Sequence, residues 1–160
     1  MDARTMPTHH DIIPKLVDEC ASIHAGCGVV LIGSVARGTE IAGSDIDLNL
    51  IFLGNECPMG QHPYVAEDNR WQLVMKEVVE GFRIDVAWET EQALLERLQS
   101  DDVVNCWPFS HGRVLRDAKR VAARCLRIAR AWFRNHPEIV ARYEAVYAEA
   151  KQQQRRNRGA

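Results

Sequence analysis

The sequence predicts an α/β fold in which a small sheet core is followed by a C-terminal helical pair. Over the first 117 residues, stretches of helical periodicity alternate with short apolar runs of strand character, and from Asp117 onward the pattern is helical alone. A length of 160 residues fits one domain. We expect a core over residues 1–117, a helical extension over 118–153 packed on the core or on a partner, and a disordered basic tail over 154–160.

The first half of the chain reads as helix, strand, helix, strand. Residues 11–28 have helical spacing with Pro14 in the first turn, and residues 28–33, "GVVLIG", are a continuous apolar run of the kind found in buried strands. Residues 34–41 fit a short helix with Ser34 as its N-cap. The next strand, "DIDLNLIFL", covers residues 45–53, and the Gly and Pro content of residues 54–63 predicts a loop.

The segment "EDNRWQLVMKEVVEG", residues 67–81, fits two patterns. Alternation of Trp71, Leu73 and Met75 suggests a strand, whereas Trp71, Val74, Met75, Val78 and Val79 also fit helical spacing. The acidic start and the closing glycine favour the helix, which is the interpretation we adopt.

The remaining elements follow from simpler signals. "FRIDVAW", residues 82–88, predicts a third strand, Thr90 caps a helix over 90–100, and "GRVL", residues 112–115, predicts a short edge strand. A wide apolar stripe from Val121 to Phe133 predicts a helix, and Pro137 opens the last one.

Composition excludes several classes of protein. The net charge of −2 argues against nucleic-acid binding, because such proteins usually carry an excess of basic residues. Five cysteines without regular spacing argue against a disulfide framework and favour a reducing cytoplasm. No apolar run approaches the roughly 20 residues that span a bilayer, and the N-terminus lacks the apolar core of a signal peptide.

Two acids interrupt the apolar strand after residue 44. Residues i and i+2 of a strand share a face, so Asp45 and Asp47 present two carboxylates side by side. Their repulsion and desolvation are most easily tolerated with a cation between them, and oxygen ligands suit Mg²⁺ or Mn²⁺. The alternative is a strand edge where both acids meet solvent.

Further residues strengthen the metal interpretation. Asp85 lies in the apolar strand over 82–88, where it either joins the first two acids or pairs with Arg83. Three carboxylates can hold two divalent ions for phosphoryl or nucleotidyl transfer. Gly33 and Ser34 stand at a strand-to-helix turn, where free N–H groups favour phosphate oxygens.

The stretch "GSVARGTEIAGSDIDL", residues 33–48, resembles the signature of the DNA polymerase beta-like nucleotidyltransferase superfamily. Its detailed form is similar to the minimal nucleotidyltransferases, including antitoxins of HEPN-type toxins, and to the N-terminal domain of aminoglycoside nucleotidyltransferases. The resemblance covers residues 28–88 and implies a nucleotidyltransferase fold, α/β (α+β), with a small mixed sheet flanked by helices.

The resemblance also implies roles for single residues. Asp45 and Asp47 would bind both of two Mg²⁺ or Mn²⁺ ions, and Asp85 would bind the catalytic one and assist deprotonation of the acceptor. Gly33 and Ser34 would hold the β- and γ-phosphates of ATP or another nucleoside triphosphate. Arg37 could reach the triphosphate, or be a solvated surface arginine. Ser44 either touches phosphate or shapes the start of the strand, and we favour the second role.

The sequence does not decide which molecule accepts the nucleotide. The interpretation we adopt is transfer of AMP to a hydroxyl of a protein partner such as a HEPN-type toxin. The alternatives are a small-molecule acceptor such as an aminoglycoside, which usually needs an acidic pocket, and a nucleotide-binding regulator without turnover. Aromatic residues of the C-terminal helices (Trp132, Phe133, Tyr143 and Tyr147) would support a homodimer contact or simply pack on the sheet. Trp107 is expected in the core, and His111 in a structural or exposed loop position.

Overall fold

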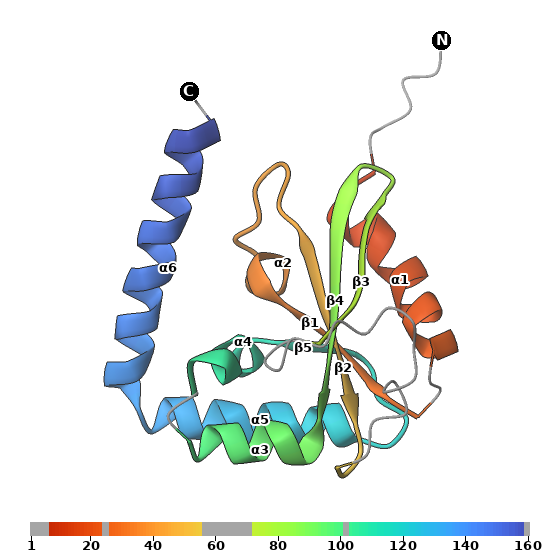
Figure 1. Cartoon of the computed structure of the whole chain (residues 1–160), viewed down its shortest axis with the longest axis vertical. Coiled ribbons are helices and arrows are strands. Elements are labelled where there is room, and N and C mark those ends of the chain that lie inside the picture. Colours follow the sequence, from red (N-terminus) through yellow and green to blue (C-terminus); the bar gives the residue numbers. More distant parts are fainter. Residues whose placement is uncertain (1–6, 24–25, 56–71, 101–102, 159–160) are drawn as a thin grey trace.

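The structure, a computed structural model, describes residues 7–23, 26–55, 72–100 and 103–158. Its described strands form one five-stranded sheet in the order β3-β4-β2-β1-β5 (Figure 1). The strands are β1 Gly28–Ile32, β2 Ile46–Phe52, β3 Gln72–Val79, β4 Phe82–Thr90 and β5 Arg113–Arg116. Strands β2 and β4 are parallel and the other neighbours antiparallel, so the predicted mixed sheet is confirmed.

Helices cover both faces of the sheet (Figure 1). They are α1 His9–Ile23, α2 Gly33–Arg37, α3 Glu91–Leu98, α4 Trp107–Ser110, α5 Val121–Arg134 and α6 Pro137–Arg158, with a 3₁₀ turn, η2, over Val103–Cys106. Helix α1 packs on one face through Ile12 and Leu16, which share a cluster with Leu48 and Leu50 of β2. Helices α3, α4 and α5 cover the other face, so both faces of β2 are buried and the strand reads as a nearly continuous apolar run.

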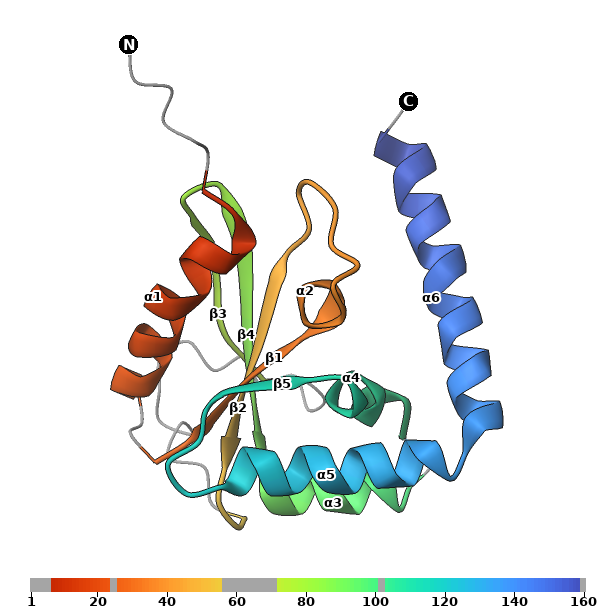
Figure 2. The same ribbon diagram turned by 180° about the vertical axis from the view of Figure 1, so that it is seen from behind.

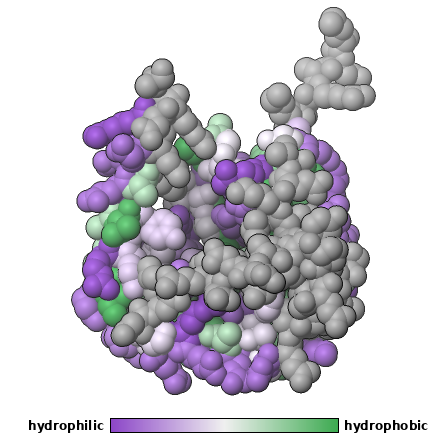
Figure 3. All heavy atoms as spheres, in the orientation of Figure 1, coloured by the Kyte–Doolittle hydropathy of each residue, from purple (hydrophilic) through white to green (hydrophobic). Residues whose placement is uncertain are grey.

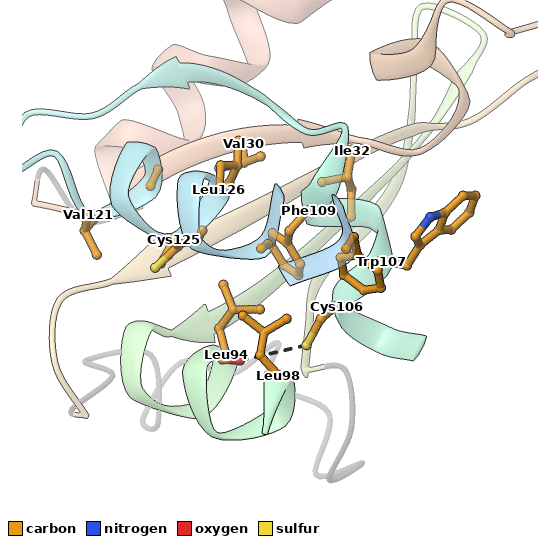
Figure 4. Packing of buried hydrophobic residues seen from close by; sticks show 14 of the residues in the cluster. Val30, Ile32, Leu94, Leu98, Cys106, Trp107, Phe109, Val121, Cys125 and Leu126 are labelled. Carbon is orange, nitrogen blue, oxygen red and sulfur yellow. Dashed lines mark hydrogen bonds between the residues drawn. The ribbon is translucent and has the colours of Figure 1, made fainter. Parts of the chain in front are cut away.

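A second hydrophobic cluster packs between the sheet and helices α3, α4 and α5 (Figure 4). Phe109 of α4 and Leu126 of α5 lie against Val30 and Leu94, all with 1% of their surface exposed or less. Trp107 lies at one end of the cluster with its indole ring turned away from Leu126 (Figure 4). The cysteines that the structure describes are Cys20, Cys27, Cys106 and Cys125; all are buried, and none of them forms a disulfide within the described part of the chain.

The favoured helix over residues 67–81 is wrong for the described part of that segment. Residues Gln72–Val79 form strand β3, which pairs antiparallel with β4, and residues 67–71 lie outside the described residues. The turn between the strands consists of Glu80 and Gly81, both with positive φ (49° and 89°). A two-residue hairpin of this kind needs positive φ at both positions, so Gly81 ends a strand and not a helix.

Helix α6 departs from the body of the molecule. Its described contacts with the core lie in its first half, where Tyr143 is buried, Ile139 and Val140 are half-buried and Tyr147 contacts Trp107. Beyond this point it stands beside α2 with hydrophilic atoms on its outer side (Figures 1 and 3). The helix continues to Arg158, so the tail expected to be disordered over 154–160 is helical through its described part. No helix among the described residues is both long enough and apolar enough to cross a membrane.

Candidate functional site

Three acids meet at one end of the parallel strand pair. Asp47 of β2 stands directly opposite Asp85 of β4 in the sheet register, and Asp45 precedes β2 by one residue. Because residues two apart in an extended chain share a side, Asp45 lies on the same side as Asp47. The structure therefore brings the three predicted carboxylates together, as the sequence interpretation required.

The Gly33 backbone closes over Asp47. Ile32, the last residue of β1, pairs with Asp47, and Gly33 follows with φ of +73°. A Cβ atom at residue 33 would lie 2.2 Å from Oδ2 of Asp47. Glycine is thus required both by the backbone conformation and by the space that the carboxylate occupies.

The surroundings of Asp47 disfavour the ionised form of its carboxyl group. Burial first, and then the neighbouring carboxylates of Asp85 and Asp45, raise its pKa from the ordinary 3.8 to about 6, against the opposing charges of Arg83 and Arg37. A negative charge here is costly because water is excluded and two like charges are close. The site therefore favours an added cation.

Arg83 supplies a positive charge of its own. Its guanidinium forms an ion pair with Asp45, and its Nη2 lies 3.7 Å from Oδ2 of Asp85. The pairing of Asp85 with Arg83, the alternative in the sequence, is thus present together with the cluster of three acids. The other oxygen of Asp85, Oδ1, is buried and has no hydrogen-bond partner among the side chains that the structure describes.

The residues present fit divalent metal ions. Asp45, Asp47 and Asp85 offer only oxygen donors, the preference of Mg²⁺ and Mn²⁺, and the buried Oδ1 of Asp85 lacks a partner. Among the described residues, no group of three or more His, Cys, Asp and Glu side chains is already arranged as a metal site. In this structure the guanidinium of Arg83 supplies the positive charge next to two of the carboxylates.

Helix α2 begins earlier than the sequence suggested. It starts at Gly33, Ile32 occupies the N-cap position, and no side chain makes a capping bond. The prediction that Ser34 is the N-cap is therefore wrong, because Ser34 lies within the first turn. Ser44 shapes the approach to β2, since its Oγ accepts a hydrogen bond from the N–H of Ile41 at 2.9 Å.

Arg37 lies between the acids and an aromatic group. Its guanidinium carbon is 5.3 Å from the ring centre of Trp107 and 5.4 Å from that of Tyr147. The two rings are 4.8 Å apart. The positive charge of Arg37 also opposes the rise in the pKa of Asp47, so this side chain interacts with both the acids and the aromatic rings. Its Nε is buried without a hydrogen-bond partner.

A cavity of about 450 Å³ opens at this aromatic group, between α2, α4 and α6. Its walls include Arg37, Trp107, His111 and Tyr147, with Glu144 as its acidic residue. Burial, followed by the charges of Arg37 and Arg130, lowers the pKa of His111 to about 4, so the imidazole is neutral at pH 7. A second cavity, about 510 Å³, lies where α5 meets α6. None of the three acids lines either cavity, and the aromatic cavity is linked to them through Arg37.

Sequence reasoning did not assign this aromatic cavity. Trp107 is 4% exposed, which agrees with its expected place in the core, yet its ring also forms a cavity wall. Tyr147 was expected in a dimer contact or in packing on the sheet, but it is 40% exposed and contacts Trp107. The two residues are distant in sequence, and no local pattern predicts that they meet.

Comparison with known families assigns the chain to one family. None of the curated proteins matches the chain. The family described as "Nucleotidyltransferase domain" matches residues 13–115, a span that contains Gly33, the three acids and β1 to β4. Since this match covers more than half of the sequence, the chain belongs to the nucleotidyltransferase domain family.

Proposed function

We propose that the protein transfers a nucleoside monophosphate, AMP from ATP, onto a hydroxyl group in a reaction that depends on divalent metal ions. The observation that carries the proposal is the pairing of Asp47 with Asp85 across parallel strands, with the Gly33 backbone against Asp47. This arrangement joins a carboxylate cluster to a turn where a triphosphate could approach the main chain.

The proposed roles follow from position. Asp45, Asp47 and Asp85 hold two Mg²⁺ or Mn²⁺ ions, and Asp85 also helps to remove the proton of the attacking hydroxyl. Gly33 and Ser34 bind phosphate oxygens. When bound, the ions neutralise charge on the reacting phosphate and lower the pKa of the attacking hydroxyl.

Arg37 completes the proposed phosphate contacts. In the structure its guanidinium rests on Trp107 and Tyr147, and its charge already acts on Asp47. A cation held loosely by aromatic rings can exchange this contact for a stronger one with phosphate. Ser44 has a structural bond to Ile41, which supports a role in shaping the start of β2.

The cavity beside Arg37 favours a hydroxyl of a protein partner, such as a HEPN-type toxin, over an aminoglycoside. A polycationic antibiotic needs several acids around it, whereas this cavity has Arg37, a neutral His111 and aromatic rings beside Glu144. A tyrosine side chain has the size and apolar character for such a cavity, and α6 leaves it open to a partner (Figure 3).

One observation favours a second candidate, a nucleotide-binding regulator without turnover. Arg83 already neutralises Asp45 and approaches Asp85, so the cluster is partly balanced without metal. In that case the protein binds ATP and transfers nothing.

The discriminating experiment uses ATP labelled at its α-phosphate, with Mg²⁺ and either a bacterial lysate or an added aminoglycoside. Label on one protein supports the proposal, label on the antibiotic supports the small-molecule alternative, and tight ATP binding without transfer supports the regulator. Asp45→Asn and Asp47→Asn should abolish transfer, while Asp18→Asn, an exposed change on α1, should not. Wild-type transfer by a folded Asp47→Asn protein would refute the assignment.

A further inference from the structure

Positive charge is concentrated in one segment of an acidic chain. Residues 113–134 contain eight of the 20 Lys and Arg residues of the protein and one of its 22 Asp and Glu residues. This segment therefore carries a charge of +7 and the rest of the chain −9, which together give the net charge of −2. The overall charge conceals a strongly basic region.

The structure places the basic residues of this segment at the surface. Helix α5 buries its apolar side, including Ala122, Leu126 and Ala129, against the sheet. Its outer side and the adjoining edge strand β5 lie at the front of Figure 2. We call the exposed, unpaired basic residues of this region the basic face: Arg113, Arg116, Lys119, Arg120, Arg127 and Arg134.

Arg130 of α5 bonds to the chain just before β5. Its Nη2 donates a hydrogen bond to the carbonyl oxygen of Gly112 at 2.6 Å, and its Nε donates one to that of Ser110 at 3.2 Å. Residues before β5 are thus bonded to the outer side of α5. Hydrophilic atoms follow the lower rim of the molecule where α3 and α5 lie (Figure 3).

No acid neutralises the basic face within the described residues. Asp117, the acid of the segment, accepts hydrogen bonds from the N–H groups of Ala122 at 3.2 Å and Ala123 at 2.8 Å. Its charge is therefore directed at the start of α5. The arginine of α5 that does find a carboxylate is Arg124, which pairs with Glu91 and does not belong to the basic face.

We propose that the basic face binds the sugar–phosphate backbone of a nucleic acid, independently of base sequence. The 14 residues of α5 make a helix about 21 Å long, and a duplex presents about 12 phosphates along such a length. Arginine is the residue that best matches phosphate geometry, and it supplies five of the six members of the face.

The other exposed residues of the segment support contact with phosphates alone. They are Val114, Ala118, Ala123 and Ala131, which are small and allow a backbone to approach. None of them is aromatic, so base stacking has no platform there. An anionic membrane is a weaker fit, because the apolar side of α5 is buried in the core and has nothing to insert into lipid.

The test measures binding of fluorescently labelled duplex DNA, duplex RNA and single strands to the whole protein by anisotropy as salt is raised from about 50 mM to 200 mM. We expect the double variant Arg127→Gln/Arg134→Gln to weaken duplex binding at least tenfold. The slope of log K against log salt should become shallower by about 1.8, since each lost phosphate contact contributes about 0.9. Neither arginine makes an ion pair among the described residues, so melting curves should show intact folding.

The matched control is Arg142→Gln/Arg156→Gln, which removes the same charge from exposed positions of α6 and also tests the basic end of the chain. It should bind duplex like the wild type. Absence of duplex binding at about 50 mM salt, or equal loss in both double variants, would overturn the proposal. Displacement of the duplex by polyglutamate at equal charge concentration would also overturn the proposal, because it would show that the basic face binds an acidic protein as well as it binds a nucleic acid.

Discussion

Replacing Asp47 with asparagine should stabilise the metal-free protein while removing its proposed activity. The pKa of Asp47 is raised from its ordinary 3.8 to about 6 by burial and by the carboxylates of Asp85 and Asp45. A carboxyl group whose pKa is higher in the folded state stabilises the fold when protonated. Its ionisation therefore costs stability as pH rises from about 4 through 6.

The size of this effect follows from the shift. About two pKa units correspond to roughly 3 kcal/mol as an upper limit, and partial solvent access reduces this to about 1–2 kcal/mol. For a chain of 160 residues, this predicts a melting temperature about 3–6 °C higher for Asp47→Asn above pH 7. Well below pH 3.8 the carboxyl group is protonated in both the folded and the unfolded state, and the difference should vanish.

Thermal melting with a chelator present, across this pH range, measures the effect, and Asp18→Asn serves as the exposed control. Adding Mg²⁺ should then raise the melting temperature of the wild type and leave that of Asp47→Asn nearly unchanged. The reasoning is refuted if Asp47→Asn melts at or below the wild-type temperature at pH 7.5 without metal.

Three further substitutions test single features of the site and the hairpin. Gly38→Ala, at a positive φ in open space, should cost only the backbone strain of ~1–2 kcal/mol. Gly33→Ala has a similar φ and adds a clash of its Cβ with Asp47, so it should cost at least ~1 kcal/mol more than Gly38→Ala and abolish stabilisation by Mg·ATP; equal losses in melting experiments would contradict this. Arg83→Gln should tighten Mg²⁺ binding about fivefold by calorimetry, since the metal no longer competes with an ion pair worth ~1 kcal/mol; unchanged affinity would show that the guanidinium does not oppose the metal. Glu80→Asn places Asn-Gly in a turn with two positive φ angles but also removes the exposed ion pair of Glu80 with Lys15. Compared with Glu80→Gln, which removes the same ion pair, Glu80→Asn should be more stable by about 0.5–1 kcal/mol in denaturant titrations, and an equal or lower stability would refute that account of the turn.

The acids and the glycine turn were predictable because their signal is local. Carboxylates inside apolar strands are costly, and this cost is visible in the sequence around Asp47 and Asp85 without knowledge of the sheet. The role of Thr90 as a helix cap was equally clear from the sequence. Its hydroxyl accepts a hydrogen bond from the N–H of Ala93 at 3.1 Å, as an N-cap side chain does. What local reasoning could not supply was the register that places the two acids opposite each other.

The errors arose where two periodicities coincide. Val74, Met75, Val78 and Val79 satisfy helical spacing, so the sequence over β3 contains a true amphipathic pattern. Tertiary context overrides it, because pairing with β4 satisfies the backbone hydrogen bonds of the segment. Arg83 shows another limit, since the sequence offered a choice between ion pair and acid cluster and the structure contains both.

The position of α6 has a consequence for how this protein can diversify. Substitutions after Tyr143 affect few buried contacts, and Tyr147 and Glu144 line the aromatic cavity from that helix. Asp47, Asp85 and the glycine turn belong instead to β2, β4 and the start of α2, where a side chain added at Gly33 would meet Asp47. Substitutions on α6 can therefore alter one wall of the cavity without touching the carboxylate cluster.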